Sequence, residues 1–228
     1  VCLGHDGREL ARHRVPTPHG DYRQVLKAVC DLIIVLEQKV GTKATIGIGT
    51  PGAISPATGL VKNANSVWLN GQPFDRDLAA ALGRPVRVAN DADCFALSEA
   101  TDGAGAGALS VFGAILGTGT GGGLVFDGKL IRGPNAIAGE WGHNPLPWPR
   151  VWPGGDERPG PACYCGRAGC IETFLSGPGM AHEFAALTGR ALGAPEIVAA
   201  AAAGDEAAIA ALDRYVDRLA RALASIIN

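Results

Sequence analysis

The chain lacks any strong excess of one charge. Its 228 residues carry 20 Lys and Arg against 22 Asp and Glu, and the formal net charge is −2. Proteins that bind nucleic acid through its phosphates display a basic surface, so this balance argues against a nucleic-acid partner. Charged residues amount to only 18% and hydrophobic residues to 47%, which is typical of a globular chain and excludes extended disorder.

Long apolar runs are missing as well. No stretch reaches the roughly 20 residues that a membrane-spanning helix needs, and no secretory signal opens the chain at Val1. These absences predict a cytoplasmic protein without a membrane partner. The length is sufficient for a full hydrophobic core, in one large domain or two small ones.

A fourth cysteine is missing from the segment that is richest in cysteine. Cys163, Cys165 and Cys170 lie within eight residues, so a local disulfide would leave one thiol unpaired. His143 lies twenty residues before Cys163, and three thiolates with one imidazole are a donor set that structural zinc takes in a tetrahedral site. The two glycines between Cys165 and Cys170 permit the tight turns that bring sulfurs onto one ion. Three unrelated buried thiols are the alternative.

In the N-terminal half, periodicity and turn signals predict alternating strands and helices. The expected elements are a strand hairpin over 1–18, a helix over 20–40 capped by Asp21, a strand over 44–52, a loop with a short hairpin over 54–74, a helix over 75–83 closed by Gly83, a strand over 84–90 and a helix over 91–103. The flexible run GAGAGA over 103–108 is the candidate domain boundary. It predicts a small N-terminal lobe over 1–106 and a large lobe over 107–228.

In the C-terminal half, a buried strand over 108–116 leads into a glycine-rich run over 117–123 and a hairpin over 124–133. Two Ala-rich helices over 195–228 are separated at Gly204-Asp205. The second helix is expected to bury one apolar face, made of Ile209, Leu212, Val216, Leu219, Leu223 and Ile226. Together these elements predict an α/β fold with a mixed sheet in two lobes.

The glycine-rich run comes directly after a buried strand. Its backbone N–H groups are expected to form a nest for phosphate, helped by the hydroxyls of Thr118 and Thr120. The run lacks the Gly-Lys-Ser/Thr ending of a P-loop, and a strand rather than a helix follows it, so it is not a Rossmann turn. A flexible or bulged strand connection is the alternative.

Asn90-Asp91 lies where a predicted strand leads into a helix. Ligands bind at the carboxyl ends of strands in open α/β sheets, and a carboxylate there can accept the proton of an attacking hydroxyl. A plain helix N-cap is the alternative, since Asp91 and Asp93 both suit a helix N-terminus.

Several other polar side chains have the chemistry of sugar contacts. Glu140 and Glu172 flank the cysteine-rich segment, and hard carboxylate oxygens compete poorly with thiolates for zinc, so they suit sugar hydroxyls better. The cluster Asn63, Asn65 and Asn70 with Trp68 is typical of polyol binding and equally of a turn-rich loop.

Taken together, these stretches resemble the ROK family of sugar kinases, repressors and related proteins. The segment GEWGH over 139–143 looks like the family's Glu-x-Gly-His element, and CYCGRAGCIE over 163–172 looks like its cysteine-rich signature. Within the family, the segments over 62–71 and 144–148 look most like bacterial fructokinases of the mannofructokinase type, with N-acetylglucosamine kinases close behind. The resemblance covers residues 1 to 228.

The resemblance implies an actin-like, ribonuclease H-like two-lobed ATPase fold with the active site in the cleft. It implies that Asp91 is the general base on the sugar hydroxyl. It assigns sugar contacts to Asn65, Asn90, Glu140, His143 and Glu172, and a structural zinc to His143, Cys163, Cys165 and Cys170. It assigns the ATP phosphates to Gly117, Thr118, Gly119, Thr120, Gly121, Gly122, Gly123 and Leu124, with Mg²⁺ as the bridging ion.

The predicted activity is therefore ATP-dependent phosphorylation of a hexose at its 6-hydroxyl, with fructose as the first choice. N-acetylglucosamine or glucose is the alternative substrate, and a homodimer is expected. A sugar-responsive repressor of the same family is a further alternative, as is a zinc-stabilised sugar-binding fragment without activity.

Three departures from the family pattern bear on this prediction. Neither the N-terminal Asp-x-Gly-Gly-Thr phosphate motif nor the late Gly-Gly-rich adenosine segment is present, so the fold is expected to be truncated at both ends. Asp93 stands where the family usually has asparagine, and a second carboxylate there is expected to raise the pKa of the base or repel phosphate.

Overall fold

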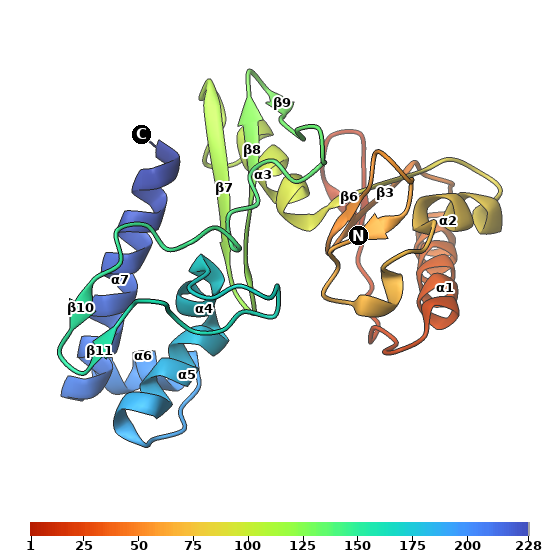
Figure 1. Cartoon of the computed structure of the whole chain (residues 1–228). Coiled ribbons are helices and arrows are strands. Elements are labelled where there is room, and N and C mark those ends of the chain that lie inside the picture. The colour runs from red at the N-terminus through yellow and green to blue at the C-terminus, as the bar shows by residue number, and fades with distance from the viewer. Residues whose placement is uncertain (228) are drawn as a thin grey trace. The chain divides into compact units, whose positions relative to one another are not determined.

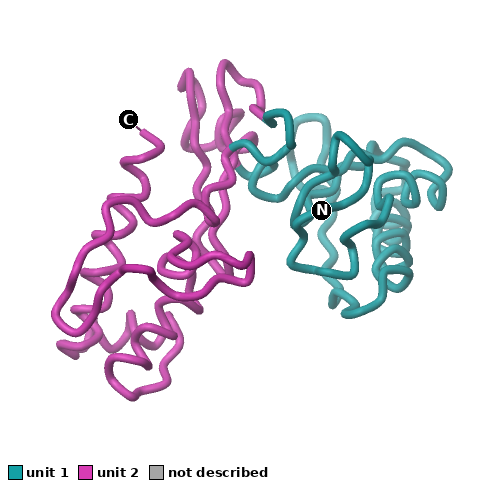
Figure 2. The backbone as a smooth tube through the Cα atoms, viewed as in Figure 1, with its two compact units in different colours: residues 1–95, 132–138 teal, residues 96–131, 139–228 magenta. Residues whose placement is uncertain are grey.

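A computed structural model of the chain describes residues 1–227, which form two compact units (Figure 2). Unit 1 comprises residues 1–95 and 132–138, and unit 2 comprises residues 96–131 and 139–228. The sequence places the boundary after residue 106, whereas the units part within helix α3 (Asp91–Thr101) and a short later segment returns to unit 1. None of the helices described for residues 1–227 is long and apolar enough to cross a membrane.

Unit 1 has the elements expected from the sequence (Figure 1). Its elements are β1 (Cys2–Leu3), β2 (Glu9–Ala11), α1 (Tyr22–Val40), β3 (Ile46–Thr50), β4 (Ala53–Ile54), β5 (Val61–Lys62), a 3₁₀ helix (Val67–Leu69), α2 (Phe74–Leu82), β6 (Val86–Asn90) and the start of α3. The hairpins β1–β2 and β4–β5 are antiparallel, and β3 pairs with β6 in parallel.

The local chemistry of α1 explains why that prediction is confirmed. The Asp21 carboxylate accepts hydrogen bonds from the backbone N–H groups of Arg23 and Gln24, which satisfies donors at the helix start. Gly41 ends the helix with φ of 72°, a left-handed conformation that favours glycine. The apolar side of α1 packs with α2 on a core formed by Val25, Val61, Ala64, Leu69, Phe74 and Leu78.

Unit 2 combines an antiparallel meander with a group of helices (Figure 1). Its elements are the rest of α3, β7 (Ser110–Leu116), β8 (Thr120–Phe126), β9 (Lys129–Leu130), β10 (Val151–Trp152), β11 (Gly155–Asp156), α4 (Ile171–Leu175), α5 (Gly177–Thr188), α6 (Ala194–Ala202) and α7 (Glu206–Ile227). The sequence predicted the β7–β8–β9 strands and the break between α6 and α7. It did not predict β10, β11, α4 or α5.

Only part of the glycine-rich run over 117–123 is a loop. Strand β8 begins at Thr120, and Gly121, Gly122 and Gly123 pair in register with Ile115, Ala114 and Gly113 of β7. Only residues 117–119 form the turn between the two strands. The glycines of β8 leave room for what packs there, since a Cβ on Gly122 would clash with the Phe112 ring and the Gly139 carbonyl.

The buried face of helix α7 differs from the apolar face that the sequence predicts. Val216 is 61% exposed and Ile209 is 41% exposed. The buried side chains are instead Ala208, Ala211, Arg218, Arg221 and Ala222. The prediction from apolar periodicity is wrong because Arg218 and Arg221 form ion pairs with carboxylates inside unit 2. These ion pairs allow charged residues of α7 to be buried. The other predicted positions, Leu212, Leu219, Leu223 and Ile226, are partly buried against the cores of the unit.

Candidate functional site

One imidazole and three thiols of unit 2 converge to a metal-sized cluster. The ligand atoms of His143, Cys163, Cys165 and Cys170 all lie within 4.8 Å of one another. His143 Nδ1 lies 3.5 Å from Cys163 Sγ, and the Sγ atoms of Cys165 and Cys170 are 3.7 Å apart. Zn–S bonds of about 2.3 Å and Zn–N bonds of about 2.0–2.1 Å in a tetrahedron give edges of roughly 3.5 Å between N and S and roughly 3.8 Å between two sulfurs. These two pairs have the spacing of zinc ligands, and the four side chains together could hold a zinc ion.

Two glycines let the cysteine segment turn back on itself. Gly166 has φ of 85° and Gly169 has φ of 71°, as the sequence predicted. The turn is closed by backbone hydrogen bonds from Cys163 N to Arg167 O (2.8 Å) and from Gly166 N to Cys163 O (3.0 Å). Burial, together with the neighbouring thiols, raises the pKa of Cys170 to about 12. Metal binding would have to displace that proton, because zinc binds the thiolate.

The loop that carries Glu140 and His143 is fixed on strand β8. Trp141 is only 1% exposed, and its Nε1 donates a hydrogen bond to the Gly121 carbonyl at 2.7 Å. Gly142 passes so close to the Thr120 carbonyl that a Cβ would clash with it. The Glu140 side chain is exposed. The buried indole therefore anchors two predicted sugar contacts that lie on either side of it.

Glu172 connects the cysteine segment to the glycine turn. It lies in the first turn of α4, and its Oε2 accepts a hydrogen bond from the backbone N–H of Thr120 at 2.8 Å. Its own backbone N–H donates to the Gly142 carbonyl at 2.9 Å. A Cβ on Gly119 would overlap the Glu172 carboxylate and would displace it from this position. Three segments that the sequence assigns to sugar, zinc and phosphate thus meet at one carboxylate.

Tyr164 is a site residue that the sequence analysis missed. Its hydroxyl lies 3.0 Å from Nε2 of His143, the ring nitrogen that faces away from the Cys163 sulfur. Desolvation of the hydroxyl, followed by the negative charge and hydrogen bonding of Glu172, raises the pKa of Tyr164 to about 12. The residue as a whole is 81% exposed, so the ring borders solvent while the hydroxyl joins two predicted sugar contacts. The position between two clustered cysteines was the available signal.

A pocket adjoins the glycine turn. Its volume is about 600 Å³. Its walls include Gly117, Thr118, Gly177, Met180, Ala194 and Tyr215. The Gly177 N–H donates to the Gly117 carbonyl at 2.8 Å, so the turn is held at the N-terminus of α5, whose cap is Ser176. A helix N-terminus beside a glycine turn favours phosphate.

The sequence offered a signal for α5 that periodicity did not use. Ser176 followed by Gly177-Pro178 combines an N-cap residue with proline in the first helical turn. The remaining predicted phosphate residues, Thr120 to Leu124, lie in the ladder of β8 rather than in the turn.

In unit 1, the structure distinguishes the two roles that the sequence left open for Asp91, a catalytic base or a helix N-cap. The Asn90 side-chain oxygen accepts from the Asp93 N–H at 3.0 Å, and its amide donates to the Gly52 carbonyl at 3.0 Å. Asn90 is therefore the helix cap, and it is 8% exposed. The Asp91 carboxylate is exposed, with a hydrogen bond from the neighbouring Ala92 N–H at 2.9 Å.

Asp93 differs sharply from Asp91. It is 6% exposed, and burial raises its pKa, opposed by the charge of Arg132 and reinforced by that of Asp91. The raised pKa belongs to Asp93, and burial rather than the neighbouring carboxylate is its main cause.

Asn65 lies on an exposed part of the loop that follows β5. The loop is held by Asn70, whose side chain accepts from Ala64 N at 2.9 Å and donates to Ala64 O at 3.0 Å. Asn63 has φ of 57°, a conformation that asparagine tolerates better than most residues. Asn63 and Asn70 thus have structural roles in the turn, and Asn65 remains available for a ligand.

Comparison with known proteins shows the family to which this chain belongs. The profile of the ROK family matches residues 1–228. The chain belongs to the ROK family. An N-acetyl-D-glucosamine kinase from Escherichia coli O139:H28 is 46% identical over 231 residues, which cover 100% of this chain and 76% of that protein.

Solved ROK structures have the same fold. A ROK hexokinase from Thermus thermophilus superposes with a TM-score of 0.77 at 32% identity, over 93% of this chain and 68% of that one. A ROK glucokinase from Streptomyces griseus, solved in complex with glucose and AMPPNP, superposes with a TM-score of 0.76 at 28% identity, over 98% and 73%. The α/β, actin-like fold predicted from the sequence is therefore confirmed.

Proposed function

We propose that this ROK protein is an ATP-dependent sugar kinase that phosphorylates N-acetylglucosamine at its 6-hydroxyl. The observation that carries the proposal is the 46% identity to an N-acetyl-D-glucosamine kinase along the whole chain. The sequence analysis put fructose first and N-acetylglucosamine as the alternative. The comparison supports the alternative, so we assign N-acetylglucosamine in place of fructose.

Asp91 is the proposed general base. It accepts the proton of the 6-hydroxyl while that oxygen attacks the γ-phosphorus of ATP and the bond to the leaving ADP breaks. The support is that Asn90, not Asp91, caps α3, which leaves the Asp91 carboxylate exposed at the end of a parallel strand. In this proposal Asn90 positions the base, because both ends of its amide are already bonded within unit 1.

The nucleotide is proposed to bind unit 2 at the glycine turn. Gly117 and Thr118 line a pocket of about 600 Å³ together with Gly177 at the N-terminus of α5. This size is within the range usual for small-molecule sites. Mg²⁺ bound to the phosphates would offset the charge that develops during transfer.

The zinc is proposed to be structural and to brace the sugar contacts. His143, Cys163, Cys165 and Cys170 provide four ligands, which leaves no open position for chemistry on the metal. The brace would fix His143 and Glu172, and through Trp141 also Glu140, relative to the glycine turn. Such positioning supplies much of the barrier reduction in phosphoryl transfer.

A coupled ADP-release assay tests the proposal. We expect turnover with N-acetylglucosamine to exceed that with glucose, mannose or fructose, and Asp91→Asn to lower kcat by roughly 10²- to 10⁴-fold. Asp31→Asn, which removes an exposed carboxylate on α1, is the matched control and should keep full turnover. Normal turnover in Asp91→Asn would remove the base assignment, and a higher kcat/KM for fructose would remove the substrate assignment.

Two alternatives are separable by binding. A sugar-responsive repressor of the same family is disfavoured by the exposed Asp91 carboxylate, which a repressor does not need. A sugar-binding protein without activity would bind N-acetylglucosamine in isothermal titration but show no heat with ATP and Mg²⁺. The predicted homodimer and cytoplasmic location stay predictions that sedimentation and cell fractionation would test.

A further inference from the structure

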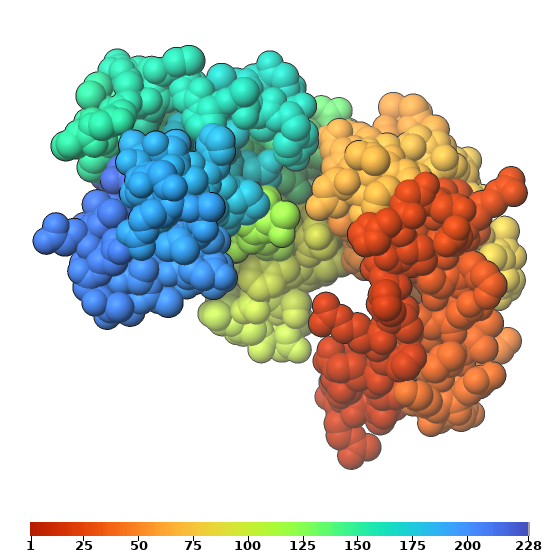
Figure 3. Space-filling view, turned by 90° about the horizontal axis from the view of Figure 1, so that it is seen from below, coloured from red at the N-terminus to blue at the C-terminus, as the bar shows by residue number. Residues whose placement is uncertain are grey.

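Unit 2 contains a second pocket that shares no residue with the proposed sugar, nucleotide or zinc sites. Its volume is about 340 Å³, and it is bordered by the β10–β11 hairpin, the segment that follows it, α4, α5 and α7. On the surface, the teal residues of the hairpin and cysteine-rich segment adjoin the blue residues of α5 (Figure 3). The walls are largely apolar, with Trp152, Phe174, Ala186 and Leu187 among them.

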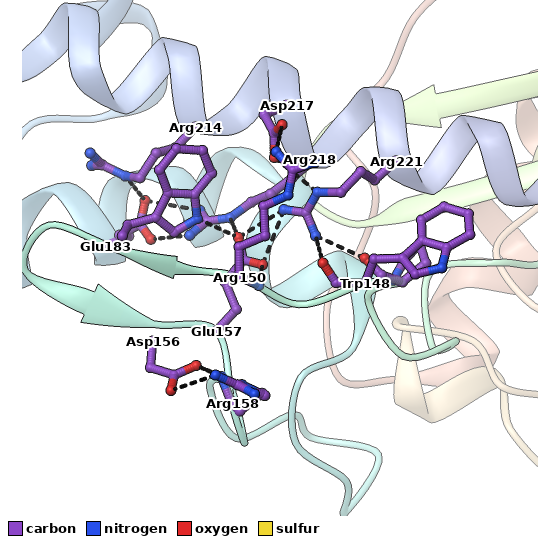
Figure 4. Close-up of polar contacts among 12 residues, drawn as sticks. Trp148, Arg150, Asp156, Glu157, Arg158, Glu183, Arg214, Asp217, Arg218 and Arg221 are labelled. Carbon is purple, nitrogen blue, oxygen red and sulfur yellow. Dashed lines mark hydrogen bonds and ion pairs between the residues drawn. The ribbon is translucent and has the colours of Figure 1, made fainter.

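A buried ion cluster adjoins this pocket, and three of its members, Glu183, Arg214 and Arg218, line the pocket wall. Glu157 is 4% exposed and accepts hydrogen bonds from Arg218 Nε at 2.8 Å and from Arg221 Nη2 at 2.9 and 3.0 Å. Glu183 accepts from Arg218 at 2.6 and 3.0 Å and from Arg214 Nε at 3.2 Å. Figure 4 shows these arginines in a row along α7, with Glu183 at the Arg214 end.

The charges of this cluster do not balance. Arg150, Arg214, Arg218 and Arg221 face the three carboxylates Glu157, Glu183 and Asp217. One positive charge is therefore in excess. The other guanidinium on the pocket wall, Arg158, is already paired with Asp156 at 3.0 Å and adds no net charge.

Arg214 is bound to this cluster by a single hydrogen bond. Its side chain is 13% exposed, and among residues 1–227 its one bonded partner is Glu183, through Nε. Its two terminal nitrogens make no hydrogen bond within residues 1–227, and Arg214 lines the pocket. Glu183 is moreover shared with Arg218, which donates to both of its oxygens.

A mostly buried guanidinium with unbonded terminal nitrogens calls for an anionic acceptor. Partial burial removes water that would otherwise solvate the charge, and the planar fork matches the two oxygens of a carboxylate or phosphate. The apolar walls favour an organic body attached to that anion. Arg218 keeps its place under the ligand because its nitrogens are bonded and its guanidinium lies 4.8 Å from the Phe174 ring centre.

We propose that this pocket binds a small organic anion, with its carboxylate or phosphate on the terminal nitrogens of Arg214 and its apolar body against Trp152 and Leu187. The site is independent of the proposed kinase reaction. Helix α5 separates it from the nucleotide pocket, since Met180 and Ala181 line that pocket whereas His182 and Glu183 line this one.

Isothermal titration of the whole chain with benzoate and with phenyl phosphate tests the proposal, and benzyl alcohol is the neutral control. We expect saturable binding of at least one anion with Kd near or below about 1 mM, and no binding of the alcohol. The better-bound anion tells whether the natural ligand is a carboxylate or a phosphate ester. Trp152→Phe should remove any fluorescence change that accompanies binding, since the indole lines the pocket.

Two variants keep the test independent of folding. Arg214→Gln should weaken binding by about tenfold or more. Leu187→Glu, on the 44%-exposed wall residue, should weaken it similarly while leaving the ion cluster intact. Arg190→Gln removes an exposed arginine that pairs with Asp205 outside the pocket and should bind as the unmodified chain does. Absence of saturation with both anions, or unchanged Kd in both pocket variants, would overturn the proposal, whatever the kinase assay shows.

Discussion

Two clusters hold irregular chain in place within unit 2, and they differ in how far apart their members lie in the sequence. The proposed zinc ligands include three cysteines within eight residues. The ion cluster joins Glu157 to Arg218, 61 residues later, and Glu183 to Arg218, 35 residues later. The first cluster was predictable from ligand type and spacing, whereas the second depends on which helix face α7 buries.

The two clusters also differ in the buried charge that remains when zinc is absent from the first or a carboxylate is removed from the second. Three thiols and an imidazole can exist uncharged without a metal, so the first cluster holds no unpaired charge when zinc is absent, and zinc would add stability by binding the folded site. The second carries its charges permanently, because an arginine does not deprotonate in a protein. Removing one carboxylate there leaves buried positive charge without compensation. The comparison therefore predicts a graded series of effects.

The largest effect is expected for Cys170→Ser. The variant should lose its zinc and most of the stability that zinc gives, because structural zinc contributes apparent binding energies of about 10–16 kcal/mol in small metal-dependent domains. Cys30→Ser, on α1 of unit 1, is the matched control and should keep the metal. Zinc content and thermal unfolding measure both, and equal metal in the two variants would contradict the ligand assignment.

The second-largest effect on stability is expected for Glu157→Gln. It leaves Arg218 and Arg221 buried with an uncharged partner, and breaking a buried pair costs about 3–5 kcal/mol in the free energy of unfolding. Asp156→Asn, in an exposed pair with Arg158, should change the free energy of unfolding little, because solvent screens that pair. Urea unfolding of both variants checks this contrast, which a similar cost for the two would refute.

The same carboxylate predicts a pH dependence. Burial alone would raise the pKa of Glu157, but hydrogen bonds from Arg218 and Arg221 lower it to about 2. A depressed folded-state pKa contributes stability above the unfolded-state value of about 4.3, and this stability is lost as pH falls towards 2. The difference in unfolding free energy between the unmodified chain and Glu157→Gln should therefore shrink by roughly 3 kcal/mol between pH 5 and pH 2. A constant difference over that range would contradict the pairing.

The smallest effect is expected for Tyr164→Phe. It removes one hydroxyl between His143 and Glu172, and a single hydrogen bond contributes about 1 kcal/mol. Zinc should stay bound, and KM for N-acetylglucosamine should rise by about fivefold with kcat nearly unchanged. Tyr22→Phe, which removes a hydrogen bond to Asp77 in unit 1, should alter stability alone. A loss of zinc from Tyr164→Phe would mean that the hydroxyl supports the metal rather than the sugar contacts.

Local chemistry explains what could be predicted from the sequence. Helix α1 follows from Asp21 and Gly41, and the turn of the cysteine segment follows from Gly166 and Gly169, because each residue acts within a few positions of itself. The roles of Asn90 and Asp91 could not be separated from position alone. They became distinct once the Asn90 amide was seen bonded to Gly52, 38 residues earlier.

Non-local chemistry explains what was missed. Periodicity predicts that an apolar stripe is buried, so it placed Val216 inside and left Arg218 outside α7. Gly121 to Gly123 looked like loop because of composition, yet they pair with β7 and make room for Gly139 and Phe112. The partners of Arg218 lie 61 and 35 residues away, and the glycines are fixed by pairing with the preceding strand rather than by their own propensity.

The most direct test of the zinc brace is metal analysis of the chain purified without chelator. The geometry of His143, Cys163, Cys165 and Cys170 predicts one zinc per chain, retained on dialysis and released by a strong chelator together with a fall in unfolding temperature. Less than about half an equivalent of zinc, or an unfolding temperature that the chelator leaves unchanged, would contradict it.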